Sequence, residues 1–351
     1  MYFRPSTHRR KTAILLYCII MLGIGFTLAC TPTSVPVVSS ENAIVGPSTA
    51  PPEIKTELRI GALRGPTSMG LVKLMQEAEE GIAANDYTFT LAGAADEISA
   101  ALLRGELDIA AIPLNLAAVL YNRTDKGVSA LAINTLGALY ILESGDSVSQ
   151  IADLRGQTVY STGKGTTPEF CLNYILAQNG IAEEDLIIEY RAEAAEIAAL
   201  LEQGMAQIAV LPEPYITSLM AKSSDLRIAL SFHEEWERVS QEGTAMVTGV
   251  TIVRNSVLAE HREAVEAFLG EYQASVEYTF AYPTETAQLI ADAGIIPNAA
   301  LAAIALPKCN IVFREGEEMQ RDAKAYLQVL YEANPQAVGG ALPEDDFYFT
   351  R

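Results

Sequence analysis

The sequence predicts an α/β fold made of two similar lobes, and three observations lead to this expectation. Patterns typical of strands and helices alternate along most of the chain, which indicates sheets of mainly parallel strands. Residues 58–115 are repeated as residues 157–214, at a constant offset of 99 positions and without a gap. The chain has 351 residues, more than one compact core usually takes. We therefore expect two βαβαβ lobes that face each other across a cleft.

Identical residues that composition does not explain carry this repeat. Gly, Pro and Glu recur at the same offset, and Thr67 stands opposite Thr166. Helices rich in Ala and Leu can match by chance, but chance does not explain the other matches. The identical pairs are Ala95/Ala194, Glu97/Glu196, Ile98/Ile197, Ala100/Ala199, Leu102/Leu201, Gly105/Gly204, Ile109/Ile208, Ala110/Ala209 and Pro113/Pro212.

In the first lobe, short apolar runs alternate with helical spacing. We expect strands over 58–63, 87–91 and 107–112, and helices from 69, over 96–104 and over 113–121. Ligands of such sheets bind beyond the carboxyl ends of the parallel strands. The loops Arg64–Ser68 and Pro113–Asn115 should therefore lie on one rim of the cleft.

The second lobe should repeat this order from residue 157 to about residue 242. We expect strands over 158–160, 186–190, 207–211 and 227–232, and helices from 170, over 194–202 and after Pro214. A short helix and turn over 147–156 precede them.

Two stretches should connect the lobes. Val128–Glu143 is long and apolar, and we interpret it as a strand that crosses from the first lobe to the second. Ala245–Arg254 is a strand that can return the chain. Two crossing strands make a hinge suited to closure around a ligand. After Arg254 we expect only helices, over 257–282, 284–293, 299–305 and 317–332. The first lobe would then comprise 57–140 and 245–351, and the second 141–244.

Residues 1–29 are typical of an export signal. A basic segment containing Arg9 and Arg10 precedes the uncharged run Thr12–Ala29. The run ends at Thr27-Leu-Ala-Cys30, which resembles the lipobox of bacterial lipoproteins. Residues 30–56 are rich in Pro, Ser and Thr and should form a flexible tether. We expect an extracytoplasmic protein that is anchored to the membrane through lipid on Cys30. The alternative is an uncleaved membrane anchor.

The formal net charge of −20 argues against nucleic acid and anionic membrane surfaces as partners, although it does not exclude a locally positive cleft. The sequence has no C-x-x-C motif, and its histidines are His8, His233 and His261. We therefore predict no metal site and no cofactor. Cys171 and Cys309 could pair or remain buried free thiols.

The stretch Ser161–Glu169 is the principal candidate for ligand binding. A strand, a Gly-rich turn and a helix in this order present free backbone N–H groups and a positive helix end. Thr166 or Thr167 can cap this helix, contact a ligand, or do both, and Pro168 suits its first turn. The repeat places Arg64–Gly70 at the same point of the first lobe.

The candidate ligand-binding residues lie on these loops, on the other strand ends and on the crossing strands. Lys164, Arg64 and Asn115 have alternative roles, as solvated charges or as a helix cap. Glu213 could accept a hydrogen bond from a cationic or N–H-bearing ligand, or pair with Lys164. The candidates are Arg64, Pro66, Thr67, Ser68, Pro113, Asn115, Asn134, Thr135, Thr162, Lys164, Gly165, Thr166, Thr167, Glu213 and Thr248.

Together these segments resemble the solute-binding proteins of ABC importers. The resemblance covers about residues 57–335 and is to the group serving aliphatic sulfonates, taurine, nitrate or bicarbonate, and thiamine-pyrimidine precursors. It is carried by Leu58–Arg64, Gly105–Pro113, Asp153–Val159, Gly163–Pro168 and Ala209–Pro214.

The resemblance implies the type 2 periplasmic binding protein fold: two Rossmann-like lobes, a two-strand hinge and extra C-terminal helices on the first lobe. It also implies a monomer that captures a small solute, anionic or polar and planar, and passes it to a membrane permease with its ATPase. Sulfonate and taurine members hold an anionic group with loop amides and hydroxyls. No catalysis is implied.

Two other functions remain as alternatives. One is an enzyme on the same scaffold, similar to thiamine-pyrimidine synthase. That family has a Cys-rich motif, a Schiff-base lysine and a site histidine, whereas Cys171 is solitary here and no histidine lies near a loop. The other is an extracellular sensor module. An ATPase is excluded, because Gly163-Lys-Gly-Thr-Thr167 lacks the full Walker pattern.

Overall fold

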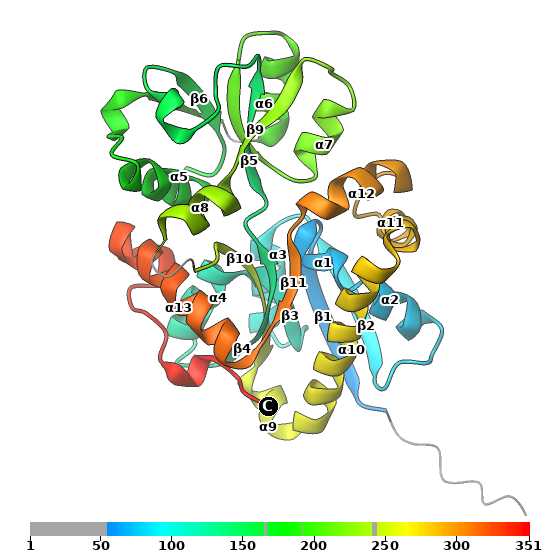
Figure 1. Cartoon of the computed structure of the whole chain (residues 1–351). Coiled ribbons are helices and arrows are strands. Elements are labelled where there is room, and N and C mark those ends of the chain that lie inside the picture. The colour runs from blue at the N-terminus through cyan, green and yellow to red at the C-terminus, as the bar shows by residue number, and fades with distance from the viewer. Residues whose placement is uncertain (1–54, 165–166, 192, 241–243) are drawn as a thin grey trace, which may run out of the picture. The chain divides into compact units, whose positions relative to one another are not determined.

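The computed structural model describes residues 55–351, apart from residues 165–166, 192 and 241–243 (Figure 1). The described strands form two mixed sheets. The first sheet has six strands in the order β11-β4-β10-β3-β1-β2, and the second has five in the order β7-β6-β8-β5-β9. The predictions for Gly165 and Thr166, and those for the segment before residue 55, concern residues outside the described ranges.

The first sheet combines parallel and antiparallel pairs. β1 pairs in parallel with β2 and β3, whereas β10 runs antiparallel to β3 and β4. All residues of β4 are buried, which suits a strand covered on both faces. Its strands are β1 (Glu57–Leu63), β2 (Asp86–Ala92), β3 (Ile109–Pro113), β4 (Val128–Leu136), β10 (Val247–Arg254) and β11 (Ile311–Arg314).

The second sheet repeats this plan. β6 is parallel to β7 and β8, and β5 is antiparallel to β8 and β9. The order β2-β1-β3-β10-β4 of the first sheet thus corresponds to β7-β6-β8-β5-β9 of the second. The strands are β5 (Leu139–Ser144), β6 (Thr158–Ser161), β7 (Ile187–Tyr190), β8 (Ile208–Pro212) and β9 (Leu226–Ser231).

The repeat seen in the sequence is confirmed by the matching elements. Helix α3 (Ala95–Leu103) corresponds residue for residue to α6 (Ala194–Glu202), and β3 corresponds in the same way to β8. Gly105 and Gly204 follow these helices with φ of 73° and 69°, a conformation that favours glycine. The Gly/Gly identity therefore has a backbone cause.

The remaining helices pack around the two sheets (Figure 1). Phe268 and Tyr272 of α10 are buried in a core with β1 residues such as Ile60. Trp236 of α8 and Tyr326 of α13 belong to another core. The helices are α1 (Pro66–Met69), α2 (Val72–Glu79), α4 (Leu114–Arg123), α5 (Thr167–Gln178), α7 (Tyr215–Met220), α8 (Phe232–Val239), α9 (Asn255–Glu260), α10 (Arg262–Ala281), α11 (Pro283–Asp292), α12 (Ala299–Ala305) and α13 (Gly316–Ala333).

The structure corrects several expected elements. The strand expected over 128–143 is two strands, β4 and β5, which belong to different sheets. The helix expected over 257–282 breaks at His261, between α9 and α10. The C-terminal part is not only helical, because β11 pairs with β4. The strand expected to reach Phe232 ends at Ser231, which caps α8 by accepting a hydrogen bond from Glu234 N.

One further correction concerns the loop expected over 64–68. It contains the short helix α1, and Gly70 and Leu71 separate α1 from α2. The chain passes from the first to the second sheet between Leu136 and Leu139, and returns between Ser231 and Val247. The assignment of 57–140 plus 245–351 and of 141–244 to the two lobes stays a prediction.

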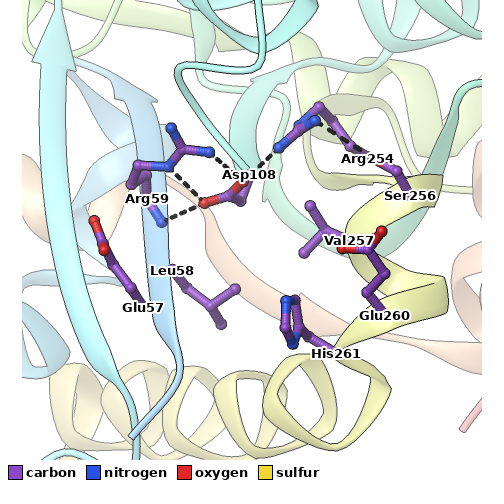
Figure 2. Close-up of a pocket in the computed structure, with 9 residues that line it drawn as sticks. All are labelled: Glu57, Leu58, Arg59, Asp108, Arg254, Ser256, Val257, Glu260 and His261. Carbon is purple, nitrogen blue, oxygen red and sulfur yellow. Dashed lines mark hydrogen bonds and ion pairs between the residues drawn. The ribbon is translucent and has the colours of Figure 1, made fainter.

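An ion-pair cluster ties three strands of the first sheet together at the end opposite to their loop-bearing rim. Asp108, just before β3, accepts hydrogen bonds from Arg59 Nε at 2.8 Å and Nη2 at 2.7 Å, and from Arg254 Nη2 at 2.6 Å (Figure 2). Arg59 lies on β1 and Arg254 ends β10. Burial by itself raises the pKa of Asp108, but the hydrogen bonds from the two arginines outweigh burial and lower the pKa to about 2.

We expect the Asp108→Asn variant to lose about 2 kcal/mol of unfolding free energy at neutral pH, because the two guanidinium groups lose their shared carboxylate. The folded-state pKa lies below the ordinary value of about 3.9. The contribution of Asp108 is therefore complete above about pH 4 and is lost as the pH falls toward 2. Denaturant unfolding at several pH values measures both effects.

The exposed pair between Arg104 and Glu106 provides the control. Glu106→Gln should leave the unfolding free energy nearly unchanged, because exposed pairs contribute little. Equal losses in the two variants would contradict a special role for Asp108.

Candidate functional site

A pocket of about 210 Å³ lies where the strand ends of the first and second sheets meet. We call it the interlobe pocket. Residues from the carboxyl ends of β1, β3, β6 and β8, or from just beyond them, line it together with residues of the chain crossings. The lining residues are Pro66, Thr67, Pro113, Thr135, Ala138, Leu139, Thr167, Pro168, Pro212, Glu213 and Thr248.

The repeat explains why these strand ends come together. Thr67 follows β1 and Thr167 follows β6, and these two strands occupy equivalent places in their sheets. Pro113 and Pro212 end the equivalent strands β3 and β8. Ligands of parallel sheets bind beyond the carboxyl ends of the strands, so this pocket is the candidate binding site.

The threonine hydroxyls of the pocket donate hydrogen bonds to other protein groups. Thr67 Oγ1 donates to the carbonyl of Leu63 at 3.2 Å, and Thr248 Oγ1 donates to the carbonyl of Leu136 at 2.7 Å. Thr135 Oγ1 donates to Asn134 Oδ1 at 2.9 Å. Each hydroxyl keeps lone pairs for a ligand, since it has one donor and two acceptor sites.

Thr167 makes the weakest of these contacts. Its hydroxyl donates to Asn115 Oδ1 at 3.5 Å, and this bond joins the start of α5 to the start of α4. The first helical turns of α4 and α5, one from each repeat, are thus in direct contact beside the pocket.

Glu213 is buried beside the pocket and forms an ion pair with Lys308. Thr217 donates to its carboxylate from Oγ1 at 2.9 Å and from the backbone N at 3.4 Å. Lys308 follows α12, and its Nζ lies 3.7 Å from Glu213 Oε1. Burial raises the pKa of Glu213, although Thr217 and Lys308 oppose this effect. The alternative pairing of Glu213 with Lys164 is wrong, because Lys164 Nζ lies over the ring of Tyr190 instead.

The structure places six of the predicted candidates away from the lining of the pocket. Arg64 donates to the carbonyls of Gly294 and Leu91. Ser68 is buried and bonds to the backbone of Gly65. The six are Arg64, Ser68, Asn115, Asn134, Thr162 and Lys164.

Asn134 and Asn115 stand directly behind the lining rather than in it. Asn134 Nδ2 donates to Thr251 Oγ1 at 3.0 Å, while its Oδ1 accepts from Thr135. Asn115 similarly accepts from Thr167. Their amides orient lining hydroxyls, so the polar groups expected in the crossing strand have partners in the protein.

Several residues of the site were missed in the sequence. Ala138 and Leu139 line the pocket at the first crossing, Pro168 lines it from the first turn of α5, and Pro212 lines it at the end of β8. The Pro113/Pro212 identity was a signal for Pro212, because Pro113 was already a candidate. No local signal pointed to Lys308, which is 95 positions from Glu213 in the sequence.

Three other pockets among the described residues are larger, but none of them is lined by both copies of the repeat. One, of about 420 Å³, surrounds the Asp108 cluster (Figure 2). The second, of about 620 Å³, lies between α2, β2 and α11, and the third, of about 220 Å³, lies beside α13. The interlobe pocket is the candidate site because both copies of the repeat line it.

In the described part of the chain, no group of three or more His, Cys, Asp or Glu residues is placed to hold a metal ion. Cys171 and Cys309 are both buried free thiols. Across the same residues, no helix combines the length and the apolar character needed to cross a membrane.

Gly249 of β10 permits the close approach of the groups around the pocket. A Cβ atom on Gly249 would lie 2.4 Å from Asn134 Oδ1 and 2.8 Å from Thr67 Cγ2. We expect Gly249→Ala to reduce the unfolding free energy by about 1–3 kcal/mol, because these neighbours must move. Chemical denaturation measures this loss.

Gly270, exposed on α10, is the matched control, because a Cβ there meets nothing within 4 Å. Gly270→Ala should stabilise the protein by up to about 1 kcal/mol through helix propensity. A Gly249→Ala variant as stable as the parent would show that the strand tolerates a side chain there.

Comparison with solved structures shows the same fold in binding proteins. An ABC transporter structure from Parabacteroides distasonis has a TM-score of 0.72 at 23% identity, covering 85% of this chain and 100% of that chain. The periplasmic aliphatic sulphonate binding protein SsuA of Escherichia coli has a TM-score of 0.67 at 17% identity, with coverages of 84% and 92%. The periplasmic nitrate-binding protein NrtA of Synechocystis PCC 6803 has a TM-score of 0.57 at 13% identity, with coverages of 80% and 82%.

No curated protein sequence matches this chain. Residues 73–302, however, match the family model described as "ABC transporter, phosphonate, periplasmic substrate-binding protein". This match spans well over half of the chain and includes strands of both sheets. The chain therefore belongs to the phosphonate-type family of periplasmic substrate-binding proteins of ABC transporters.

Proposed function

We propose that this protein captures one small solute in the interlobe pocket by hinge closure and delivers it to the permease of an ABC importer. The observation that carries the proposal is the lining of the pocket by equivalent loops of the two repeats, through Thr67 on one side and Thr167 on the other. A solute held between them contacts both lobes at once. Such a solute favours the closed state to the extent that it binds that state better than the open one.

The crossing strands support closure as the mode of capture. Thr135 of β4 and Thr248 of β10 line the pocket, and the chain crosses between the sheets at the ends of these strands. Ala138 lies within the first crossing. A change in backbone angles at a few such residues can move one lobe against the other.

The proposal also covers where the protein is anchored and which proteins it works with. The family is periplasmic, and we infer that the chain is held at the outer face of the cell membrane by lipid on Cys30, with residues 30–56 as a tether. We also infer that it acts as a monomer and without catalysis. Its partners would be the permease and ATPase subunits of the importer.

Solute binding should disappear when the pocket is filled from both sides. We expect the double variant Thr67→Phe and Thr167→Phe to lose the ligand-induced rise in melting temperature that the parent shows in a screen of sulfonates, phosphonates, small anions, amines, pyrimidines and carboxylates. A ligand bound only to the folded state raises stability by mass action, and a filled pocket removes that gain. Small-angle scattering should also show that ligand reduces the radius of gyration of the parent only.

Thr88→Phe serves as the control, because Thr88 is exposed on β2, away from the pocket. This variant should retain the shift in melting temperature. An unchanged shift in the double variant would rule out the interlobe pocket as the binding site.

Lipid attachment predicts that the mature protein is heavier than its amino-acid sequence alone. The mature protein from a bacterial membrane fraction should begin at Cys30 and carry the mass of its acyl chains. Cys30→Ser should abolish that mass and move the protein to the soluble fraction, since the lipid provides the anchor. Intact-mass spectrometry and fractionation measure both changes, and a Cys30→Ser protein that stays in the membrane would favour an uncleaved anchor instead.

A further inference from the structure

The chemistry of the pocket lining restricts which solute it takes, and this restriction rests on the proposed function. In the described residues, no Arg, Lys or His side chain lines the interlobe pocket. The sequence adds no positive charge at Gly165 or Thr166. Phosphonate, sulfonate and nitrate groups are oxyanions, which proteins bind with cationic side chains, N–H groups and hydroxyl donors.

The cations on the loops next to the pocket, and the cation that pairs with Glu213, bind other groups. Lys308 Nζ donates to the carbonyl of Ile304 at 3.0 Å and to Thr217 Oγ1 at 3.2 Å, and it pairs with Glu213. Lys164 lies 5.6 Å from the centroid of the Tyr190 ring. Arg64, as described above, donates to carbonyls outside the pocket. Each of the three therefore already has a partner, and none of them lines the pocket.

Prolines reduce the number of backbone donors at the helix starts around the pocket. Pro66 is the first residue of α1, Pro113 precedes α4 and Pro168 lies in the first turn of α5. All three line the pocket. Proline has no N–H, so each of these positions lacks a group that a helix N-terminus otherwise offers to an anion.

The hydroxyls present acceptors rather than donors. The single protons of Thr67 and Thr248 go to the backbone carbonyls of Leu63 and Leu136, which can only accept. Turning either proton toward a ligand would remove the partner of a carbonyl, which costs free energy when that carbonyl is buried. The remaining lone pairs of the hydroxyls are suited to a ligand that donates.

We propose that the interlobe pocket selects a small solute that donates hydrogen bonds, an amine or amino-substituted ring on an apolar body, rather than an oxyanion. The apolar body would pack against Ala138, Leu139 and the proline rings. Its N–H groups would meet the lone pairs of Thr67, Thr135 and Thr248. The carboxylate of Glu213, which lines the pocket and pairs with Lys308, adds a further hydrogen-bond acceptor rather than a donor.

Matched probes test this selection in the full mature protein. Titration calorimetry and thermal shift compare propylamine and 4-aminopyrimidine with propanesulfonate and propylphosphonate, all at millimolar concentrations. We expect the two amino compounds to bind and the two oxyanions to bind at least about tenfold more weakly. Tighter binding of the oxyanions overturns the inference and leaves the proposed function standing. Binding of neither class counts against the inference and the proposed function together.

Two sets of variants locate the cause. Thr248→Val removes one acceptor with little change of shape and should weaken binding of 4-aminopyrimidine roughly tenfold, whereas Thr88→Val on the exposed face of β2 should not. The double variant Pro66→Ala and Pro168→Ala restores two N–H groups and should strengthen propylphosphonate binding severalfold without strengthening that of the amines. If Thr248→Val does not weaken binding of 4-aminopyrimidine and the double proline variant does not strengthen binding of propylphosphonate, the lining does not set the selectivity.

Discussion

Each sheet contains an antiparallel strand that the chain brings in from the other sheet, and the rest of the molecule depends on this exchange. β5 enters the second sheet directly after β4 leaves the first, and β10 enters the first sheet between β3 and β4. Hydrogen bonds on both sides hold β10 and β5 in their sheets. The crossings are therefore anchored at both ends, and the pocket forms beside them.

Close approach at the crossing gives the pocket its shape. Gly249 lets β10 lie against Thr67 and Asn134, so the loop after β1 rests on a crossing strand. Thr135 and Thr248 then face the same space as Thr67. The strands that would act as the hinge are thus part of the binding surface, and a ligand there would contact the hinge as well as both rims.

Contacts outside the pocket also link segments that pack beside the two sheets. The Tyr140 hydroxyl of β5 donates to the carbonyl of Lys308 at 2.6 Å, next to the ion pair of Lys308 with Glu213. On α13, Tyr326 packs against Trp236 of α8 with ring centroids 5.3 Å apart. Under the proposed hinge closure, a ligand would shift the balance between these contacts and those of an open state only by its differential affinity for the two states.

The order of elements was largely readable from the sequence, because alternating hydrophobic periods and turn residues are local properties. Local features of the chain also explain why some elements were not predicted. β11 has only four residues, and α8 follows β9 directly with Ser231 as its cap. The break at His261 lies inside one continuous helical pattern, where periodicity does not reveal it. The division of Val128–Glu143 depended on which sheet each half joins, which is a long-range property.

For the site, the repeat by itself determined which loops would face each other: it aligned Thr67 with Thr166, next to Thr167, and Pro113 with Pro212. Only the tertiary structure decided which polar atoms point into the pocket. Arg64, Lys164 and Glu213 were all candidates in the sequence. Gly294 and Tyr190 engage the first two away from the pocket, whereas Glu213 lines the pocket and pairs with Lys308. A charged side chain goes to whatever partner the fold brings within reach, and Gly294 and Lys308 lie far from Arg64 and Glu213 along the chain.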